Sequence, residues 1–377
     1  MPYVTIQQLP IYYQITFDDI LEGNVDVSKM TVPNITNTRT CYRETLNPKL
    51  VNQYNIPSIV TALSSFNSKY SPLFEKERQS LYDTFYIPKK SGGLRKIDAP
   101  IPELMTALRE LKEIFETNMP ACYHTSAFAY IKGRCTIDSV KRHQQNESKW
   151  FAKFDFSNFF GSTTEQFVMK MLSTIFPFSE IVKYPAGEAV LKKALNLSFL
   201  NAGLPQGTPI SPLITNIMMI PIDFKICNDL RKMDEHFVYT RYADDILVSS
   251  KIKFDCGKIQ DYIIGVLNSF GAPFILNKQK TRFGSAAGRN WNLGVMLNKD
   301  NNITIGYRKK KTFKAMCCNY ICDKKNGIKW DKHDVQVFAG LISYYKMIEP
   351  DYIDYIIKHN NEKFSVDINS LIKDDLK

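Results

Sequence analysis

Long hydrophobic runs are missing from this chain of 377 residues. No stretch approaches the roughly 20 apolar residues that a transmembrane helix needs. Met1 to Ile20 carry polar residues throughout, where a secretory signal would need an apolar segment. These two absences argue against a membrane protein and against a secreted one. We therefore expect a cytoplasmic protein without a membrane partner.

Paired cysteine motifs are missing as well. The eight cysteines are scattered, and the one cluster, Cys317, Cys318 and Cys322, lacks the CxxC pairs of a structural zinc site. This spacing favours reduced structural thiols, which suit a cytosolic protein. Internal repeats and low-complexity tracts are also absent.

What the chain has in excess is positive charge. It carries 49 Lys and Arg against 38 Asp and Glu, a formal net charge of +11. With 44% hydrophobic residues the chain is expected to fold. A charge excess of this size favours a polyanionic partner, most simply nucleic acid; a basic protein without such a partner is the alternative. The length suits two or three subdomains around a shared cleft.

Strand and helix patterns are mixed along the sequence. Gly92 and Gly93 predict the turn of a hairpin. The alternation of Ala152, Phe154 and Phe156 with polar residues predicts a strand with one apolar face. Further patterns predict a helix after Pro102, a helix from Ser211-Pro212, a strand, turn and strand over residues 237–250, and helices after about residue 307.

Three aspartates interrupt apolar strand segments. Asp244 and Asp245 stand between the apolar segments 237–238 and 246–248, and Asp155 falls on the polar face of its strand. Burying an unpaired carboxylate is costly, and a divalent cation would cancel the repulsion. If the two strands are neighbours, the three carboxylates form one Mg²⁺ site suited to phosphoryl displacement. Solvent-facing turn aspartates are the alternative.

Several further motifs accompany these aspartates in one order. They are Lys89 to Ile97, Tyr130 to Arg134 with Thr136 to Asp138, Phe154 to Phe160, Gly203 to Pro212, Tyr242-Ala243-Asp244-Asp245, Asn277 to Thr281, and Leu293-Gly294. Each resembles a motif of reverse transcriptases, and together they span roughly residues 80 to 320. The sequence is similar to bacterial members: retrons, group II intron enzymes and antiphage defence reverse transcriptases, the last being the preferred subclass.

The resemblance implies an α+β fold with the right-hand architecture of polymerases. Residues 81–149 would form the fingers, and residues 150–306 the palm, an antiparallel sheet backed by helices with some fingers elements interleaved. Residues 307–377 would form a helical thumb. Residues 1–80 are an N-terminal extension without an assigned role.

The resemblance also implies the catalytic chemistry. Asp155 and Asp244 would ligate two Mg²⁺ ions, with Mn²⁺ as a substitute, and Asp245 would support them. Phe156 is expected among the metal-binding positions. Lys280 is the candidate that protonates the leaving pyrophosphate, and a surface lysine is the alternative.

Phe160 is expected to be a sugar gate, because a bulky ring at this motif position would clash with a ribose 2′-hydroxyl and favour dNTPs. A core aromatic is the alternative interpretation, and both can hold together. The other residues that the resemblance assigns to the triphosphate, the sugar or the nascent base pair are Lys89, Lys90, Arg95, Phe156, Asn158, Phe159, Gln206 and Gly207.

Nucleic-acid contacts are expected from a basic run and from one histidine. The run is Arg308, Lys309, Lys310 and Lys311, which would bind the phosphates of a duplex. His143 is a candidate contact to a cognate RNA, with a structural histidine as the alternative.

The expected activity is RNA-templated DNA synthesis in a retron-like or antiphage defence system. The expected partners are an RNA template, in particular a structured noncoding RNA, the DNA product and dNTPs. A homo-oligomer or an accessory defence protein is a further partner class. The alternatives are template-independent or protein-primed DNA synthesis on the same scaffold, and an RNA-binding scaffold with a vestigial site.

Overall fold

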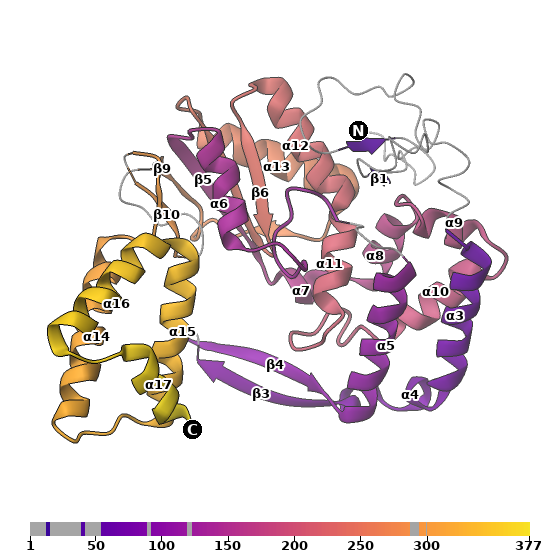
Figure 1. Ribbon diagram of the computed structural model, residues 1–377. Helices are drawn as coiled ribbons and strands as arrows, with labels where there is room; N and C mark the ends of the chain where they lie inside the picture. Colours follow the sequence, from indigo (N-terminus) through magenta and orange to yellow (C-terminus); the bar gives the residue numbers. More distant parts are fainter. Residues whose placement is uncertain are drawn as a thin grey trace.

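The computed structural model describes residues 54–88, 92–118, 123–286, 294–298 and 300–377 (Figure 1). It also describes the backbone of two short strands near the N-terminus, β1 (Tyr13–Ile15) and β2 (Arg39–Cys41), which pair antiparallel. Lys89 and Lys90, two residues expected to bind the triphosphate, lie outside the described residues.

A five-stranded antiparallel sheet forms the centre of the chain. Its order is β6-β7-β5-β8, and β9 also pairs with β5. The strands are β5 (Trp150–Ser157), β6 (Val238–Tyr242), β7 (Asp245–Ser250), β8 (Ile275–Leu276) and β9 (Arg282–Ser285). Strand β5 is therefore central, which places residues of one strand beside three others.

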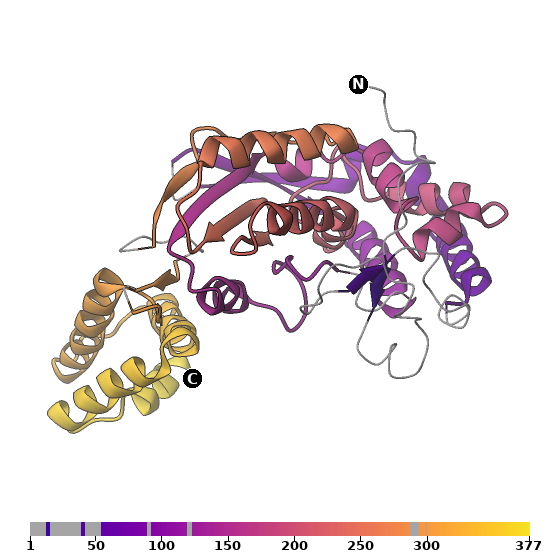
Figure 2. The same cartoon turned by 90° about the horizontal axis from the view of Figure 1, so that it is seen from above.

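The two faces of the sheet have different neighbours. Ala152, Phe154 and Phe156 of β5 belong to a large core with helices α12 (Ile220–Met233) and α13 (Cys256–Phe270). Phe151, on the other face, packs with helix α6 (Thr136–Gln145). Figure 2 shows α6 on the opposite side of the strands from α13. The alternation predicted for β5 is confirmed, because successive side chains point to opposite faces.

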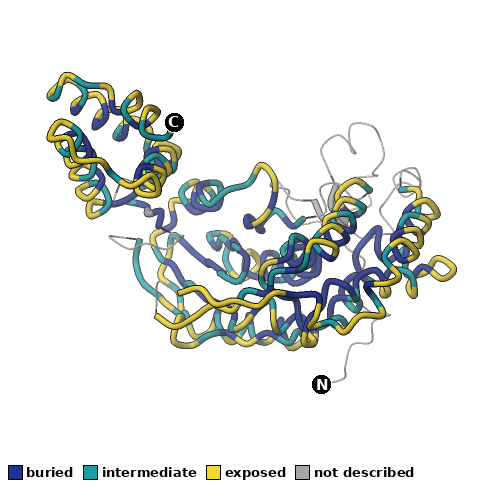
Figure 3. The backbone as a smooth tube through the Cα atoms, turned by 90° about the horizontal axis from the view of Figure 1, so that it is seen from below, coloured by how far each residue is buried: buried dark blue, intermediate teal, exposed yellow. Residues whose placement is uncertain are grey.

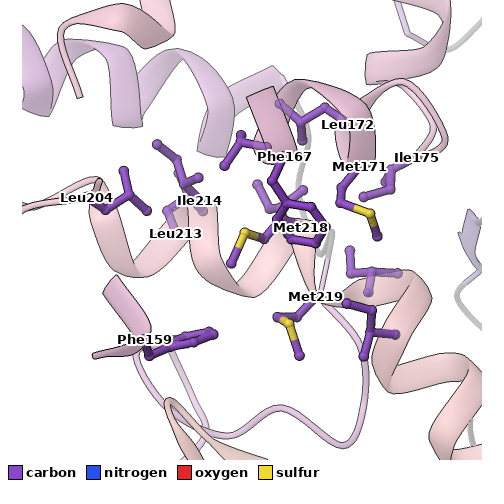
Figure 4. Packing of buried hydrophobic residues seen from close by; sticks show 14 of the residues in the cluster. Phe159, Phe167, Met171, Leu172, Ile175, Leu204, Leu213, Ile214, Met218 and Met219 are labelled. Carbon is purple, nitrogen blue, oxygen red and sulfur yellow. The ribbon is translucent and has the colours of Figure 1, made fainter. Parts of the chain in front are cut away.

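Helices beside the sheet extend the large core. Leu104, Leu108, Leu111 and Phe115 form the buried face of α5 (Pro102–Asn118), the helix predicted after Pro102. Figure 4 shows Phe167 of one helix packed beside Met218 of another, within the cluster that also contains Phe159. The other elements of this part are α3 (Ile56–Lys69), α4 (Ser71–Glu75), the 3-10 turn η4 (Arg78–Leu81), α7 (Phe159–Ser162), α8 (Glu165–Leu172), α9 (Phe178–Lys183), α10 (Gly187–Asn196) and α11 (Ser211–Met218).

A two-stranded hairpin projects from this part of the molecule (Figure 1). It pairs β3 (Tyr82–Pro88) with β4 (Leu94–Pro100), antiparallel and in register from end to end. Most of its side chains are exposed, including large apolar ones such as Tyr86 and Leu94. The hairpin predicted from its glycines is confirmed.

The C-terminal residues form a helical unit whose core is continuous with Phe151 of the sheet and with helix α6. It comprises α14 (Tyr307–Lys325), α15 (Lys332–Ile348), α16 (Pro350–Phe364) and α17 (Ile368–Leu376), preceded by the strand pair β10 (Met296–Leu297) and β11 (Ile303–Thr304). Phe313, Tyr320 and Phe338 are buried within it. Figure 3 shows the buried inner and exposed outer sides of these helices. The α+β fold class is confirmed.

None of the helices among the described residues is long and apolar enough to span a membrane.

Candidate active site

Strand pairing brings the three predicted aspartates together. Asp155 of β5 lies directly opposite Asp245 at the start of β7. Asp244 lies in the tight turn between β6 and β7, and its carbonyl oxygen accepts a hydrogen bond of 3.1 Å from the amide of Phe156. The preceding residue, Ala243, has a φ of +56°. The turn therefore presents two adjacent carboxylates beside a third on the neighbouring strand.

Two lysines contact these carboxylates. The ammonium of Lys153 is 2.8 Å from Oδ2 of Asp245, and the ammonium of Lys280 is 2.8 Å from Oδ1 of Asp155. The side chain of Lys153 is 21% exposed and that of Lys280 is 59% exposed. Lys153 is thus held within the sheet, whereas Lys280 reaches the site from a turn at the surface.

Burial and mutual repulsion disfavour the negative charge on these carboxylates. Burial raises the pKa of Asp244, and the neighbouring Asp245 and Asp155 raise it further. Burial also raises the pKa of Asp245, against the opposing effect of Lys153. The hydrogen bond to Asp155 raises the pKa of Lys280. A further positive charge would therefore be stabilised here, because it relieves both desolvation and repulsion.

The donor atoms fit a hard divalent cation, since carboxylate oxygens are the ligands that Mg²⁺ prefers. As the side chains are placed, however, the described part of the chain holds no group of three His, Cys, Asp or Glu residues arranged for a metal ion. Lys153 and Lys280 meet two of the three carboxylates instead. A divalent cation would have to replace these contacts, so the metal role of Asp155, Phe156, Asp244 and Asp245 stays a prediction.

A buried ion pair supports the turn between β6 and β7 that carries Asp244, called here the aspartate turn. Arg241 and Asp223 are fully buried and make a two-pronged contact with N–O distances of 2.8 to 3.1 Å. Another guanidinium nitrogen of Arg241 donates to the carbonyl oxygen of Ala243 at 3.1 Å and to Oδ1 of Asn216 at 3.3 Å. The hydroxyl of Tyr239 donates to Asp223 at 2.6 Å. The network ties helix α12 to the turn that carries Asp244.

Sequence reasoning missed Asp223 and Arg241 as contributors to the site. Both are charged residues in otherwise apolar segments: Asp223 follows Ile220-Pro221-Ile222, and Arg241 precedes the aspartate turn. A charge at a buried position needs a partner, so the pair was detectable as two unexplained charges. Their pairing was not, because they belong to different elements.

The residues of the aromatic motif after Asp155 differ in burial: some lie in the core and others reach the surface. Phe156 and Phe159 are 1% and 2% exposed, and their rings stack with centroids 5.3 Å apart. Their side chains are therefore unavailable to a nucleotide, and the substrate-binding prediction for these two residues stays a prediction that only their backbone could meet. Phe160 is partly exposed and Asn158 is exposed, with a φ of +49°. The ring centroids of Phe160 and Phe159 are 5.7 Å apart, so Phe160 packs on the core, and its role as a sugar gate stays a prediction.

The loop carrying Gln206 and Gly207 packs against the base of the hairpin. The carbonyl oxygen of Gln206 accepts a hydrogen bond of 2.9 Å from the amide of Asp98. Gly207 has a φ of +127°, and a Cβ there would lie 2.9 Å from the carbonyl oxygen of Asp98. The close approach seen at this glycine is to strand β4; the expected contact with a base pair stays a prediction.

Residues 87–321, more than half of the chain, match the model of the family described as reverse transcriptase (RNA-dependent DNA polymerase). The chain belongs to the reverse transcriptase family. It is accordingly an RNA-directed DNA polymerase, as predicted.

The relatives of this reverse transcriptase are bacterial retron enzymes. The retron Ec83 reverse transcriptase of Escherichia coli is 27% identical over 310 residues, which cover 81% of this chain and 95% of the relative. The retron Ec73 enzyme of the same species is 28% identical over 272 residues, 71% of this chain and 83% of the relative. Among the lineages that the motifs resemble, these relatives support the retron type.

A telomerase from Candida albicans, solved with a fragment of telomeric RNA, aligns over 98% of this chain and 64% of its own, less than two thirds, with 14% identity and a TM-score of 0.46. That likeness is too distant to bear on function. Reverse transcriptases in general use divalent metal ions.

His143 of the reverse transcriptase cannot contact RNA through its side chain, because it is 1% exposed. Its Nδ1 lies 2.6 Å from Oγ of Ser249 and its Nε2 lies 2.8 Å from Oγ1 of Thr240. Burial lowers the pKa of His143 to about 3, so the ring is neutral at physiological pH. The nucleic-acid role predicted for His143 is wrong, and the structural alternative holds.

His143→Ala should therefore destabilise the reverse transcriptase without weakening its affinity for RNA. The substitution removes the contacts of the ring with Ser249 and Thr240, at about 0.5–1.5 kcal/mol for each hydrogen bond. The two hydroxyls keep their bonds with Ser148 and Ser139. Urea unfolding and RNA binding measured on the same protein check this, with the exposed His333→Ala as a matched control. Lost RNA affinity at unchanged stability would contradict the assignment.

The basic run of the reverse transcriptase is only partly free for nucleic acid. Arg308 and Lys311 are exposed on α14. Lys309 donates to the carbonyl oxygen of Gly294 at 2.6 Å. Lys310 pairs with Glu349 and lies 4.3 Å from the ring centroid of Tyr352. Lys310 thus serves the internal packing of the C-terminal helices, and Arg308 and Lys311 remain the better candidates for phosphate contact.

Proposed function

We propose that this reverse transcriptase copies an RNA template into DNA with two Mg²⁺ ions held by Asp155 and Asp244. The observation that carries the proposal is the strand register, which sets Asp155 opposite Asp245 and places Asp244 in the adjoining turn. When bound, the ions supply charge stabilisation for an in-line phosphoryl displacement.

The remaining groups of the site have separate roles in this proposal. Lys153 neutralises Asp245, so Asp245 supports the site without carrying its full charge into it. Lys280, which is largely exposed and has a raised pKa, holds a proton that it can deliver to the leaving pyrophosphate. Arg95, exposed on β4, faces the triphosphate as a planar fork of donors.

The parts of the fold take the names expected from the sequence. The central sheet and its helices within residues 150–306 act as the palm, residues 81–149 as the fingers, and residues 307–377 as the thumb. The template is a structured noncoding RNA, and the DNA product serves a retron-like antiphage system. The retron names of the relatives support this assignment.

A primed RNA template of known sequence tests the proposal. Purified protein is given Mg²⁺ and dNTPs, and the product is sequenced. Template-complementary DNA supports the proposal. Homopolymeric or random product made without template would establish the untemplated or protein-primed alternative. Tight RNA binding without any incorporation would leave only an RNA-binding scaffold with a vestigial site.

Phe160→Ala should relax the choice of sugar. Removing the ring takes away the clash with a ribose 2′-hydroxyl, so we expect rNTP incorporation relative to dNTP to rise by about 10- to 100-fold, the range that pocket sterics reach. Single-nucleotide incorporation with dATP and ATP measures the ratio. Phe254→Ala, which removes a partly exposed ring that packs on Phe237 and Phe283, is the control and should leave the ratio unchanged.

A further inference from the structure

Tyr130 is an exposed aromatic residue in a buried segment. Its side chain is 60% exposed, whereas Phe128, Ala129 and Ile131 around it are 4%, 1% and 8% exposed. An isolated exposed aromatic needs no explanation in itself. The conformation of its backbone and the groups around its ring distinguish Tyr130 from an ordinary surface tyrosine.

The backbone of Tyr130 has a φ of +59°, in the left-handed region. That region is uncommon for residues other than glycine and is strained for a bulky side chain. Strained residues persist only where the surrounding structure holds them, and they gather at functional sites. The left-handed backbone of Tyr130 must therefore be held in place by the residues around it.

The flanking residues are hydrogen-bonded to the aspartate-bearing strand and its support. Ala127 pairs with Arg241 in a parallel bridge, and the amide of Phe128 donates to the carbonyl oxygen of Arg241 at 2.9 Å. The carbonyl oxygen of Ala129 accepts from Nδ2 of Asn216 at 2.8 Å. Arg241 and Asn216 are the residues that also support the aspartate turn. The position of Tyr130 is thus tied to the position of Asp244.

The ring of Tyr130 contacts the expected sugar gate, and its hydroxyl interacts electrostatically with residues assigned to the metal ions and to the triphosphate. It meets the ring of Phe160 nearly edge-on, with centroids 6.5 Å apart and planes at 70°. Partial desolvation raises the pKa of its hydroxyl, Asp244 and Tyr242 raise it further, and Arg95 lowers it. The hydroxyl therefore lies within the electrostatic reach of both Asp244 and Arg95, while the ring backs the expected sugar gate.

We propose that Tyr130 is a specificity-determining residue that holds Phe160 in place and forms, with it, the surface against which the sugar of the incoming nucleoside triphosphate rests. This inference depends on the proposed nucleotide site. An edge-to-face pair restricts both rings, so Phe160 gains a fixed orientation from its exposed neighbour. The strained backbone is the means by which a short, buried segment turns one large side chain outward into the site.

Two substitutions separate the ring from the backbone. Tyr130→Asn removes the ring, and asparagine tolerates a positive φ, so the segment keeps its conformation. Tyr130→Phe keeps the ring and removes the hydroxyl. We expect Tyr130→Asn to raise the KM for dATP and to lower the preference for dATP over ATP, each by about 10-fold. Tyr130→Phe should keep both within about 2-fold, because the ring contact remains.

A double variant tests whether the two rings act together. If Tyr130 acts by holding Phe160, Tyr130→Asn should leave the dATP-to-ATP preference of a Phe160→Ala protein unchanged, since interacting residues are not additive. An unchanged preference and KM in Tyr130→Asn alone would overturn the proposal. A loss of RNA-template affinity at unchanged nucleotide KM would assign Tyr130 to the template and would also overturn it.

A binding readout keeps this test independent of turnover. Stabilisation of the full chain against heat by dATP and by ATP, measured with Mg²⁺ and no template, should differ in the wild type and converge in Tyr130→Asn. A protein that discriminates in binding but synthesises no DNA would refute the polymerase assignment and uphold that of Tyr130. Equal stabilisation by the two nucleotides in the wild type would refute the assignment of Tyr130.

Discussion

Asp244→Asn should abolish DNA synthesis while leaving the fold intact. The carboxylate of Asp244 stands at the tip of the turn and is the group that the proposal gives to both metal ions. Loss of several kcal/mol of metal-assisted charge stabilisation corresponds to a fall in rate of at least about 10³-fold. Primer extension on an RNA template measures the rate, and Asp261→Asn, an exposed aspartate on α13, is the matched control.

The same substitution should not destabilise the protein in the absence of divalent cations. The pKa of Asp244 is raised by burial and by its acidic neighbours. The carboxyl group of Asp244 therefore binds a proton more tightly in the folded state than in the unfolded chain. The stability contributed by the group is then complete below the unfolded pKa and falls as pH rises through the folded pKa. Asparagine does not ionise and so avoids this loss of stability. At neutral pH the Tm of Asp244→Asn should therefore equal or exceed that of the wild type.

The dependence of the Tm on Mg²⁺ concentration is a second test of the role of Asp244. A cation that binds the folded state alone raises its stability with concentration. Mg²⁺ should therefore raise the Tm of the wild type more than that of Asp244→Asn. An equal rise in both proteins, together with normal synthesis by the variant, would contradict the role assigned to Asp244.

Breaking the buried pair of Asp223 and Arg241 should produce the largest loss of stability. Asp223→Asn leaves the guanidinium of Arg241 buried without its counter-charge and weakens the bond from Tyr239. Removing one partner of a buried ion pair typically costs about 3–5 kcal/mol. Urea unfolding measures the loss. Lys225→Ala, which breaks a partly exposed pair on the same helix, should cost no more than about 1 kcal/mol.

A double substitution separates stability from activity at this pair. Asp223→Leu with Arg241→Met removes both charges, and apolar replacement of a buried pair is often neutral. It also removes the bonds from Arg241 to Ala243 and Asn216. The double variant should therefore regain much of the stability and still lose on the order of 10²-fold in rate, as expected for a displaced reacting group. Normal synthesis by a stable double variant would show that the pair does not position the turn.

Local patterns in the sequence were enough to predict part of the site. The alternation along β5 separates Asp155 from its apolar neighbours, because side chains in any strand alternate between faces. The adjacent aspartates Asp244 and Asp245 between two apolar segments predict a turn, and the order of the motifs identifies the family. These inferences need only residues close in sequence, together with a pattern that other proteins share.

Other features depended on residues far apart in the chain. Asp155 and Lys280 belong to separate elements, and so do Asp223 and Arg241, so packing alone decides that they meet. Burial also reversed the prediction for His143, which lies on a polar-looking helix but packs beneath β6 and β7 with Ser249 and Thr240. The hydrophobic periodicity of a helix does not state which polar side chain its neighbours will cover.

The sequence by itself determined the family, the α+β class and the identity of the three carboxylates, since these follow from motif order and strand periodicity. The tertiary structure alone decided which charged residues surround them. Lys153 and Lys280 pair with two of the carboxylates, and the buried pair of Arg241 and Asp223 supports the turn that carries Asp244. It also decided that Phe156 and Phe159 are core residues while Phe160 and Tyr130 face outward. The physical reason is that exposure and ion pairing depend on contacts between elements, and those contacts exist only once the sheet and its helices have packed.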